Sequence, residues 1–188
     1  MFSLRSKNKY KSITPEIYQN IIERSRSKFF YLNMGIDDSF ESRFDIIILH
    51  SFIIFYFLKN ISDNEKKLSQ FLFDFMFDDF DNNLREMGFG DIAVNKKMKV
   101  SITAFYGRIA NYSQGVEQIQ KNNDDDILNK AILNNIYKGN ESSMHNLKFF
   151  KQYILGNLTF FGSRDININI NDKFRFIDLP IQKDYNER

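Results

Sequence analysis

The sequence predicts an all-α protein, a compact single-domain helical bundle of about six helices with an extended C-terminal tail. Three observations support this fold class. Apolar residues recur at helical spacing in successive segments, capping residues such as Thr14 and Asp91 precede several segments, and glycines or polar runs end them. We therefore divide the chain into a basic flexible N-terminus (1–12), a helical domain (13–162) and an extended tail (163–188).

The composition excludes several classes of protein. One domain is expected from 188 residues. Because the chain contains no cysteine, disulfides, thiolate metal sites and cysteine nucleophiles are excluded. The formal net charge of +2 is too small to indicate a general nucleic-acid-binding protein. Any argument from charge must therefore concern a local surface.

The N-terminal segment 1–12 carries four cationic side chains and no acidic one. No apolar segment of signal-peptide length follows it. We interpret this segment as a solvated, frayed end. The alternative is weak contact with anionic lipid or with ribosomal RNA phosphates.

The first helix is expected to begin at Thr14. A capping hydroxyl is followed there by Pro15 at the first helical position and by Glu16 in the first turn. The segment 29–35, which ends in a glycine, is expected to close this helix.

The second helix contains the most apolar run of the chain, residues 46–58, in which only His50 and Ser51 are not hydrophobic. A residue among 37–39 is expected to cap it. A bilayer span needs about 20 apolar residues, and this run is shorter and closely flanked by charges such as Lys59. We predict a buried core helix, with a membrane-dipping segment or a true span as alternatives.

The third and fourth helices are expected to form a hairpin. The third should run from about 64 to 87 after a cap at 62–63, with Gly88 as its stop. Asp91 is expected to cap the fourth, which should continue to about residue 120.

Two further helices and the tail complete the prediction. A polar break at 122–126 precedes a fifth helix that should end near 138, and Ser142 or Ser143 is expected to open a sixth that ends near 161. From residue 164 isoleucine and asparagine alternate with a period of two. Because isoleucine is abundant throughout the chain, we favour an extended tail on the domain surface over a sheet strand.

An acidic strip follows one face of the third helix. Asp74, Asp78, Asp81 and Arg85 are spaced four, three and four residues apart, which places them on one helical face. A solvated strip partnered by Arg85 is the simplest interpretation. The alternatives are a strip that contacts a partner, and a metal site or general acid–base pair of an enzyme.

Lys96, Lys97 and Lys99 lie in the early turns of the fourth helix, where cations oppose the helix macrodipole. The acidic residues near the end of the third helix oppose its dipole as well. The two groups are expected to approach and pair across the Gly88–Asp91 turn, although exposed pairs contribute only ~0–1 kcal/mol. Such a pattern suggests a recognition surface, and a solvated face is the alternative.

Histidine and glycine patterns do not indicate a cofactor. His50 lies within the apolar run, and we interpret it as a core histidine whose hydrogen bonds are satisfied; haem ligation is the alternative, but no second ligand has suitable spacing. The Gly88-x-Gly90 pair joins two helices and lacks the strand and third glycine of a dinucleotide site. Arg108 is either an anion or backbone binder or a structural group that covers its helix.

Several ordered motifs resemble those of one known family. They are RFD at 43–45 followed by LH at 49–50, LFD at 72–74 with MF at 76–77, LREMG at 84–88 with GD at 90–91, and AFYGR at 104–108. Together they resemble the ubiquinol–cytochrome c chaperone family, clearly over about residues 34–112 and more weakly to about 161. Phe89 and the Asn/Ile tail depart from the family pattern. No mitochondrial presequence precedes the motifs, which favours a bacterial, cytoplasmic member.

The resemblance implies a non-enzymatic assembly chaperone for the bc1 complex that binds newly made cytochrome b and needs no cofactor. It also implies two further partners, the ribosome, contacted near the exit of its peptide tunnel, and a small partner protein. Peripheral contact with the inner face of the inner membrane is implied as well. We expect the partner-binding residues to be Arg43, Asp45, His50, Asp74, Asp78, Arg85, Glu86, Asp91, Lys96, Lys97, Lys99, Tyr106 and Arg108. The rival interpretations are a ribosome- or RNA-associated module and a metal-dependent enzyme that uses the acidic strip.

Overall fold

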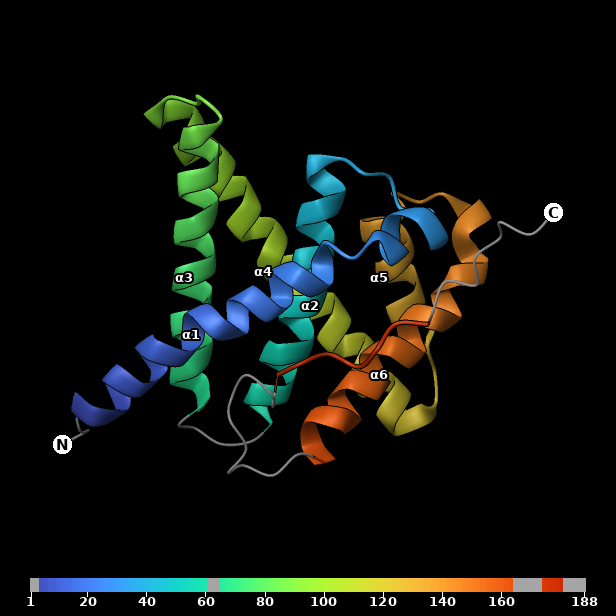
Figure 1. Ribbon diagram of the computed structural model, residues 1–188. Coiled ribbons are helices and arrows are strands. Elements are labelled where there is room, and N and C mark those ends of the chain that lie inside the picture. The colour runs from blue at the N-terminus through green and yellow to red at the C-terminus, as the bar shows by residue number, and fades with distance from the viewer. Residues whose placement is uncertain (1–3, 61–64, 164–173, 181–188) are drawn as a thin grey trace, which may run out of the picture.

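Helix α2 (Phe40–Lys59) forms the centre of the fold. It contacts α1, α3, α4, α5 and α6 (Figure 1). The helix begins after Ser39, whose hydroxyl accepts a hydrogen bond from the Ser42 amide at 3.2 Å. The apolar run 46–58 is buried against neighbours on all sides, which confirms the prediction of a core helix. No described helix is both long and apolar enough to cross a membrane.

The computed structural model describes residues 4–60, 65–163 and 174–180. Within these ranges the secondary structure is helical, and no strand occurs. The predicted all-α fold class is therefore confirmed. The elements are α1 (Leu4–Ser25), the π-helical turn η1 (Phe29–Asn33), α2, α3 (Glu65–Glu86), α4 (Asp91–Asn122), α5 (Asp126–Ile136), the 3-10 helix η2 (Glu141–Asn146) and α6 (Leu147–Ser163).

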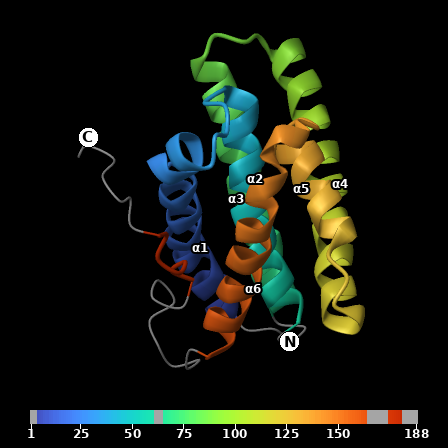
Figure 2. The same ribbon diagram turned by 90° about the vertical axis from the view of Figure 1, so that its right-hand side faces the viewer.

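Helices α3 and α4 form an antiparallel hairpin whose turn lies at one end of the molecule (Figures 1 and 2). Gly88 at the turn has φ +87°, a left-handed conformation that favours glycine, and it ends α3 as predicted. With 32 residues, α4 is about 48 Å long and reaches from this turn to the opposite end. In Figure 1, α1 crosses in front of α3 and α2.

The first helix begins earlier than predicted, because α1 starts at Leu4 and contains Pro15 in its interior. An interior proline lacks the amide for its own helical hydrogen bond and its ring crowds the carbonyl four residues earlier, so other contacts must hold α1 together here. The hydroxyl of Thr14 does not cap a helix start but donates to the Tyr10 carbonyl at 2.7 Å. The ring of Tyr10 packs on Phe71 of α3, with centroids 6.3 Å apart, so tertiary packing extends the helix to the N-terminal side of the local start signal. The predicted domain boundaries remain a prediction.

Two predicted caps are also corrected. Gly90, and not Asp91, is the N-cap of α4; Asp91 is the first helical residue and its carboxylate meets Arg85. The sixth segment opens with η2, capped by Asn140, whose side chain accepts from the Ser142 amide at 3.1 Å. α6 therefore begins a turn later than predicted. The predicted cap of the third helix lies outside the described residues.

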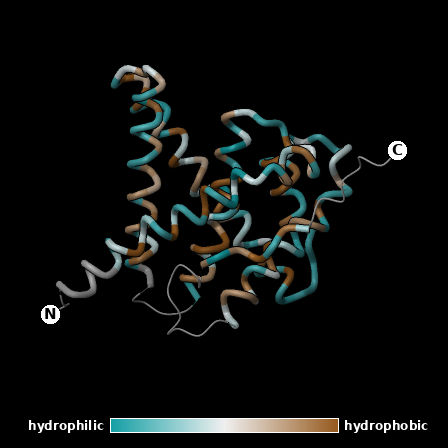
Figure 3. The backbone as a smooth tube through the Cα atoms, in the orientation of Figure 1, coloured by the Kyte–Doolittle hydropathy of each residue, from teal (hydrophilic) through white to brown (hydrophobic). Residues whose placement is uncertain are grey.

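Part of the tail packs against the helices. Phe174 and Phe176 are buried, and the Phe176 ring lies 4.8 Å from that of His50. Arg24 of α1 donates to the Phe176 carbonyl at 3.1 Å. The tail thus contributes to the core that Figure 3 shows as brown segments where the helices meet. The Ile/Asn alternation at 166–171 lies outside the described residues.

Candidate functional site

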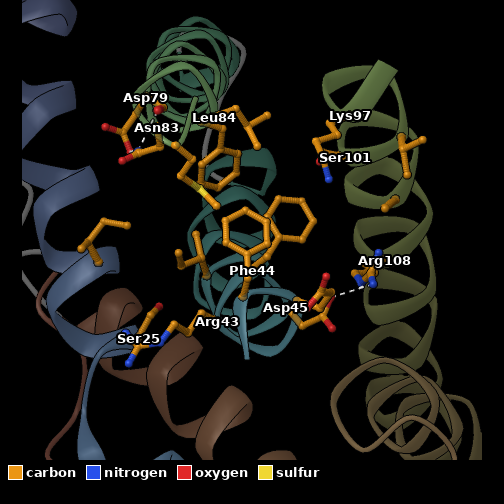
Figure 4. A pocket seen from close by; sticks show the side chains of 18 of the residues that line it. Ser25, Arg43, Phe44, Asp45, Asp79, Asn83, Leu84, Lys97, Ser101 and Arg108 are labelled. Carbon is orange, nitrogen blue, oxygen red and sulfur yellow. Dashed lines mark hydrogen bonds and ion pairs between the residues drawn. The ribbon is translucent and has the colours of Figure 1, made fainter. Parts of the chain in front are cut away.

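A groove of about 870 Å³ opens between α1, α2, α3 and α4, next to the hairpin turn. Figure 4 shows it with Phe44 of α2 at its centre, Leu84 of α3 on one side and Ser101 of α4 on the other. The rings of Phe44 and Phe80 pack with centroids 5.2 Å apart and form an aromatic floor. The groove is therefore built by residues from helices that are distant in sequence.

The wall contributed by α4 follows one helical face. Its lining residues recur at intervals of three or four, as expected for positions on one side of a helix. The small side chains of Ala93, Ser101 and Ala104 leave room in front of this face. Cationic side chains lie toward both ends of it, namely Lys96, Lys97 and Arg108.

Large apolar side chains are exposed at the groove margin. Phe40 is 53% exposed, Met87 57% and Val100 63%. Exposed apolar groups that cluster around a concave surface mark interaction sites more often than apolar groups scattered singly. The groove thus combines an aromatic floor with an uncovered apolar margin.

A buried carboxylate lies at the inner end of the groove. Asp45 of α2 is only 1% exposed, and its Oδ1 lies 2.6 Å from Nη2 of Arg108. The ammonium of Lys138 pairs with Oδ2 of the same carboxylate and also donates to the Asn135 carbonyl at 2.8 Å. Burial raises the pKa of Asp45, and the two cations act against that rise. Two cations around one carboxylate leave a local excess of positive charge.

The wall contributed by α3 carries one carboxylate toward the groove, that of Asp79 (Figure 4). The Tyr18 hydroxyl of α1 donates to it at 2.7 Å, and the Asn83 amide donates at 3.0 Å. Burial and the neighbouring carboxylate raise the pKa of the Tyr18 hydroxyl, which stays a donor. The two long walls of the groove therefore differ in charge.

The hairpin turn is bridged by an arginine. Arg85 pairs with Asp81 at 2.5 Å and with Asp91 across the turn. The expected pairing of the α4 lysines with the α3 acids is not formed in the described part of the chain. Lys97 instead lies over the Phe89 ring, 4.7 Å from its centroid. Lys97 and its neighbour Lys96 therefore keep their charge available to a partner.

His50 lies in the core and does not line the groove, although its Nδ1 lies 2.9 Å from the hydroxyl of Ser25, which does. It is fully buried, its Nδ1 lies 2.9 Å from the Ile46 carbonyl and its Nε2 lies 3.0 Å from the Tyr153 hydroxyl. A carbonyl only accepts, so Nδ1 carries the proton and Nε2 accepts from Tyr153. Burial lowers the pKa of His50 to about 3, so the ring is neutral. This geometry agrees with a core histidine whose hydrogen bonds are satisfied.

The structure brings together only some of the predicted partner-binding residues. Five of them line the groove, namely Arg43, Asp45, Lys96, Lys97 and Arg108. Arg85 and Asp91 bridge the turn, and His50 is in the core. The others are exposed outside the groove lining, namely Asp74, Asp78, Glu86, Lys99 and Tyr106.

The acidic strip of α3 does not converge on a metal site. Asp74 accepts a hydrogen bond from Gln70 at 2.7 Å, and Asp81 pairs with Arg85. Among the residues that the structure describes, no group of three or more His, Asp or Glu side chains is arranged to hold a metal ion.

Sequence reasoning missed most of the groove lining, including Phe40, Met87, Val100 and Lys138. Phe40 could have been selected from the sequence, because it directly follows the cap residue Ser39. The first turn of a helix is usually solvated, so an aromatic side chain there indicates an exposed apolar group. Lys138 carries no signal, since it meets Asp45 from 93 positions away.

Comparisons with known proteins agree with the motifs. A family model described as Ubiquinol-cytochrome C chaperone matches residues 32–166. Two curated relatives named ubiquinol-cytochrome c reductase complex assembly factor 1, from Mus musculus and Homo sapiens, are each 27% identical over 111 residues, which is 59% of this chain. The matches cover 38% and 37% of those proteins, so the chain spans well under half of their length.

A solved structure extends the similarity to almost the whole chain. The crystal structure of the Cbp3 homolog from Brucella abortus superposes with a TM-score of 0.76 at 27% sequence identity. The match covers 93% of this chain and 94% of that one.

Proposed function

Because this chain belongs to the ubiquinol-cytochrome C chaperone family, we propose that it is a non-enzymatic assembly factor of the bc1 complex that holds an apolar helix of newly made cytochrome b in the groove between α1, α2, α3 and α4. The observation that carries this proposal is the exposed apolar margin around the aromatic floor. The names of the curated relatives refer to assembly of the same complex.

The chemistry of the groove suits this task. A membrane helix outside the bilayer exposes apolar side chains, and covering them stabilises the complex by roughly 25 cal/mol per Å². Phenylalanine and methionine side chains adapt to irregular apolar surfaces, and Phe40, Phe44 and Met87 supply them. The volume is suitable as well, since a helical turn about 10 Å across and 5.4 Å long fills roughly 420 Å³. About two turns of a client helix would therefore fit in the groove.

On this proposal the protein acts in the cytoplasm, at the inner face of the membrane that will receive the client. The family resemblance implies two further partners: the ribosome, contacted near the exit of its peptide tunnel, and a small partner protein. The exposed Lys96 and Lys97 are cations of the kind that a ribosome would contact. A contact of that kind would depend steeply on salt, because each neutralised phosphate releases counterions.

The test is co-purification from the protein's own cells. We compare wild type with Phe40→Asp plus Val100→Asp, which places two charges at the groove margin. Both side chains are more than half exposed, so we expect the variant to keep its fold, checked by circular dichroism. The matched control is Leu32→Asp plus Met144→Asp, two exposed apolar residues outside the groove.

We expect cytochrome b to co-purify with wild type and the control and to be lost with the groove variant. Equal recovery in all three would refute the groove as client site. Recovery of RNA with no cytochrome b would favour the RNA-associated module, and stabilisation by a divalent metal ion would favour the enzyme interpretation.

A further inference from the structure

We propose that the groove selects helices that carry carboxylates along one edge, and that this acidic edge lies against Lys96 and Lys97 on the α4 wall. This inference rests on the proposed function, because it names a chemical property of the client that the same groove would hold. Apolar burial supplies the attraction, and the charged wall determines which apolar helices bind and in which orientation.

Charge in the groove is strongly one-sided. Six cationic side chains and three carboxylates line it, an excess of three positive charges. Asp38, outside the lining, pairs with Arg43 at 2.6 Å and reduces the excess to two. The formal net charge of the whole chain is also +2, so the residues outside the groove and Asp38 carry equal numbers of positive and negative charges.

The two lysines concentrate this charge near the hairpin turn. Both are exposed, and neither forms an ion pair among the described residues. They lie in the first two turns of α4, where the partial positive charge of the helix N-terminus adds to theirs.

The opposite wall accounts for the orientation. Asp79 on α3 is negative, and its hydrogen-bond donors Tyr18 and Asn83 are neutral, so a second acidic edge would be repelled there. Figure 4 shows Lys97 and Arg108 on the α4 side of the groove and Asp79 on the far side of Leu84 and Phe44, where Tyr18 of α1 donates to it. A client helix with its acidic edge toward α4 satisfies both walls.

The experiment measures binding of labelled peptides by fluorescence anisotropy to the full chain. Each peptide has about 18 residues, since shorter helices are marginal in water. All carry the same leucine face at positions i, i+3, i+4 and i+7, and they differ only in having glutamate, glutamine or lysine along one edge. The protein variant is Lys96→Gln plus Lys97→Gln, and the control with the same charge change is Lys130→Gln plus Lys148→Gln, exposed residues outside the groove.

We expect wild type and the control to bind the glutamate-edged peptide about fivefold more tightly than the glutamine-edged one, a preference in the range for two exposed ion pairs. The lysine-edged peptide should bind most weakly. In Lys96→Gln plus Lys97→Gln the glutamate and glutamine peptides should bind equally.

Failure of the inference is distinguishable from failure of the proposed function. If all three peptides bind wild type with equal affinity, the groove binds apolar helices without regard to charge, and only the inference is overturned. If no peptide binds, the proposed groove function fails as well. Binding of anionic phospholipid vesicles that is lost in the lysine variant, with no preference among peptides, would overturn the inference in favour of a membrane surface.

Discussion

Removing the largely covered arginine at the inner end of the groove should destabilise the protein far more than removing the more exposed lysine that shares its carboxylate. Asp45 is 1% exposed, Arg108 18% and Lys138 51%. When Arg108 becomes methionine, the carboxylate stays buried and keeps only a half-exposed partner. When Lys138 becomes methionine, the more buried pair with Arg108 remains.

The magnitude follows from the distances and the burial. Opposite charges about 4 Å apart interact by about 4 kcal/mol at an effective dielectric constant near 20. Breaking a buried pair costs about 3–5 kcal/mol, and an exposed pair contributes ~0–1 kcal/mol. We therefore expect Arg108→Met to lower the free energy of unfolding by about 3 kcal/mol and Lys138→Met by at most about 1 kcal/mol.

Urea denaturation monitored by circular dichroism is the assay. Stability changes appear as shifts of the midpoint at constant slope. In thermal unfolding, a loss of about 3 kcal/mol corresponds to a Tm lower by about 6 to 12 °C for a chain of this size. The double variant Asp45→Leu plus Arg108→Met should recover most of the loss, because replacing a whole buried pair with apolar groups is often neutral. Equal costs for Arg108→Met and Lys138→Met, or a double variant less stable than Arg108→Met, would refute this reasoning.

Three further predictions concern the core. Burial lowers the pKa of His50 to about 3, and a histidine in the unfolded chain titrates near 6.5, so between these values the unfolded state binds the extra proton. The free energy of unfolding should fall as pH drops below about 6.5, by up to about 1.4 kcal/mol per pH unit, and urea titrations should show a smaller fall in His50→Gln. Phe176→Ala should cost about 3 kcal/mol by chemical denaturation while the exposed Arg175→Ala costs little, and similar midpoints would contradict the packing of the tail. Gly115→Ala should lower Tm, because its Cβ would meet the Leu128 backbone at 2.8 Å, whereas Gly107→Ala on the open side of α4 should raise it; a higher Tm for Gly115→Ala would show that the α4–α5 contact can relax.

Local patterns in the sequence were sufficient to predict the fold class. Ser39 before an apolar run and Gly88 after a periodic one are signals carried by a few neighbouring residues, and both lie where expected. The start of α1 was mispredicted for the same reason. Thr14 and Pro15 form a local start signal, but packing of Tyr10 on Phe71 decides where the helix begins.

The groove could be predicted only in part. Arg43, Asp45 and Arg108 were selected by motif, and all three line it. Its shape depends on small residues of α4 that face the aromatic floor formed by α2 and α3. A local sequence pattern cannot predict which residues of distant helices face one another. The pairing of Asp45 with Lys138 likewise depends on how distant helices pack.

The most direct test of the central claim is site-specific photocrosslinking in the protein's own cells. A benzophenone amino acid is placed at Val100 on the groove margin, and in a separate variant at Leu32, which is exposed outside the groove. The account predicts that newly made cytochrome b is captured from position 100 and not from position 32. Capture from position 32 alone, or equal capture from both, would contradict the claim that the groove holds the client.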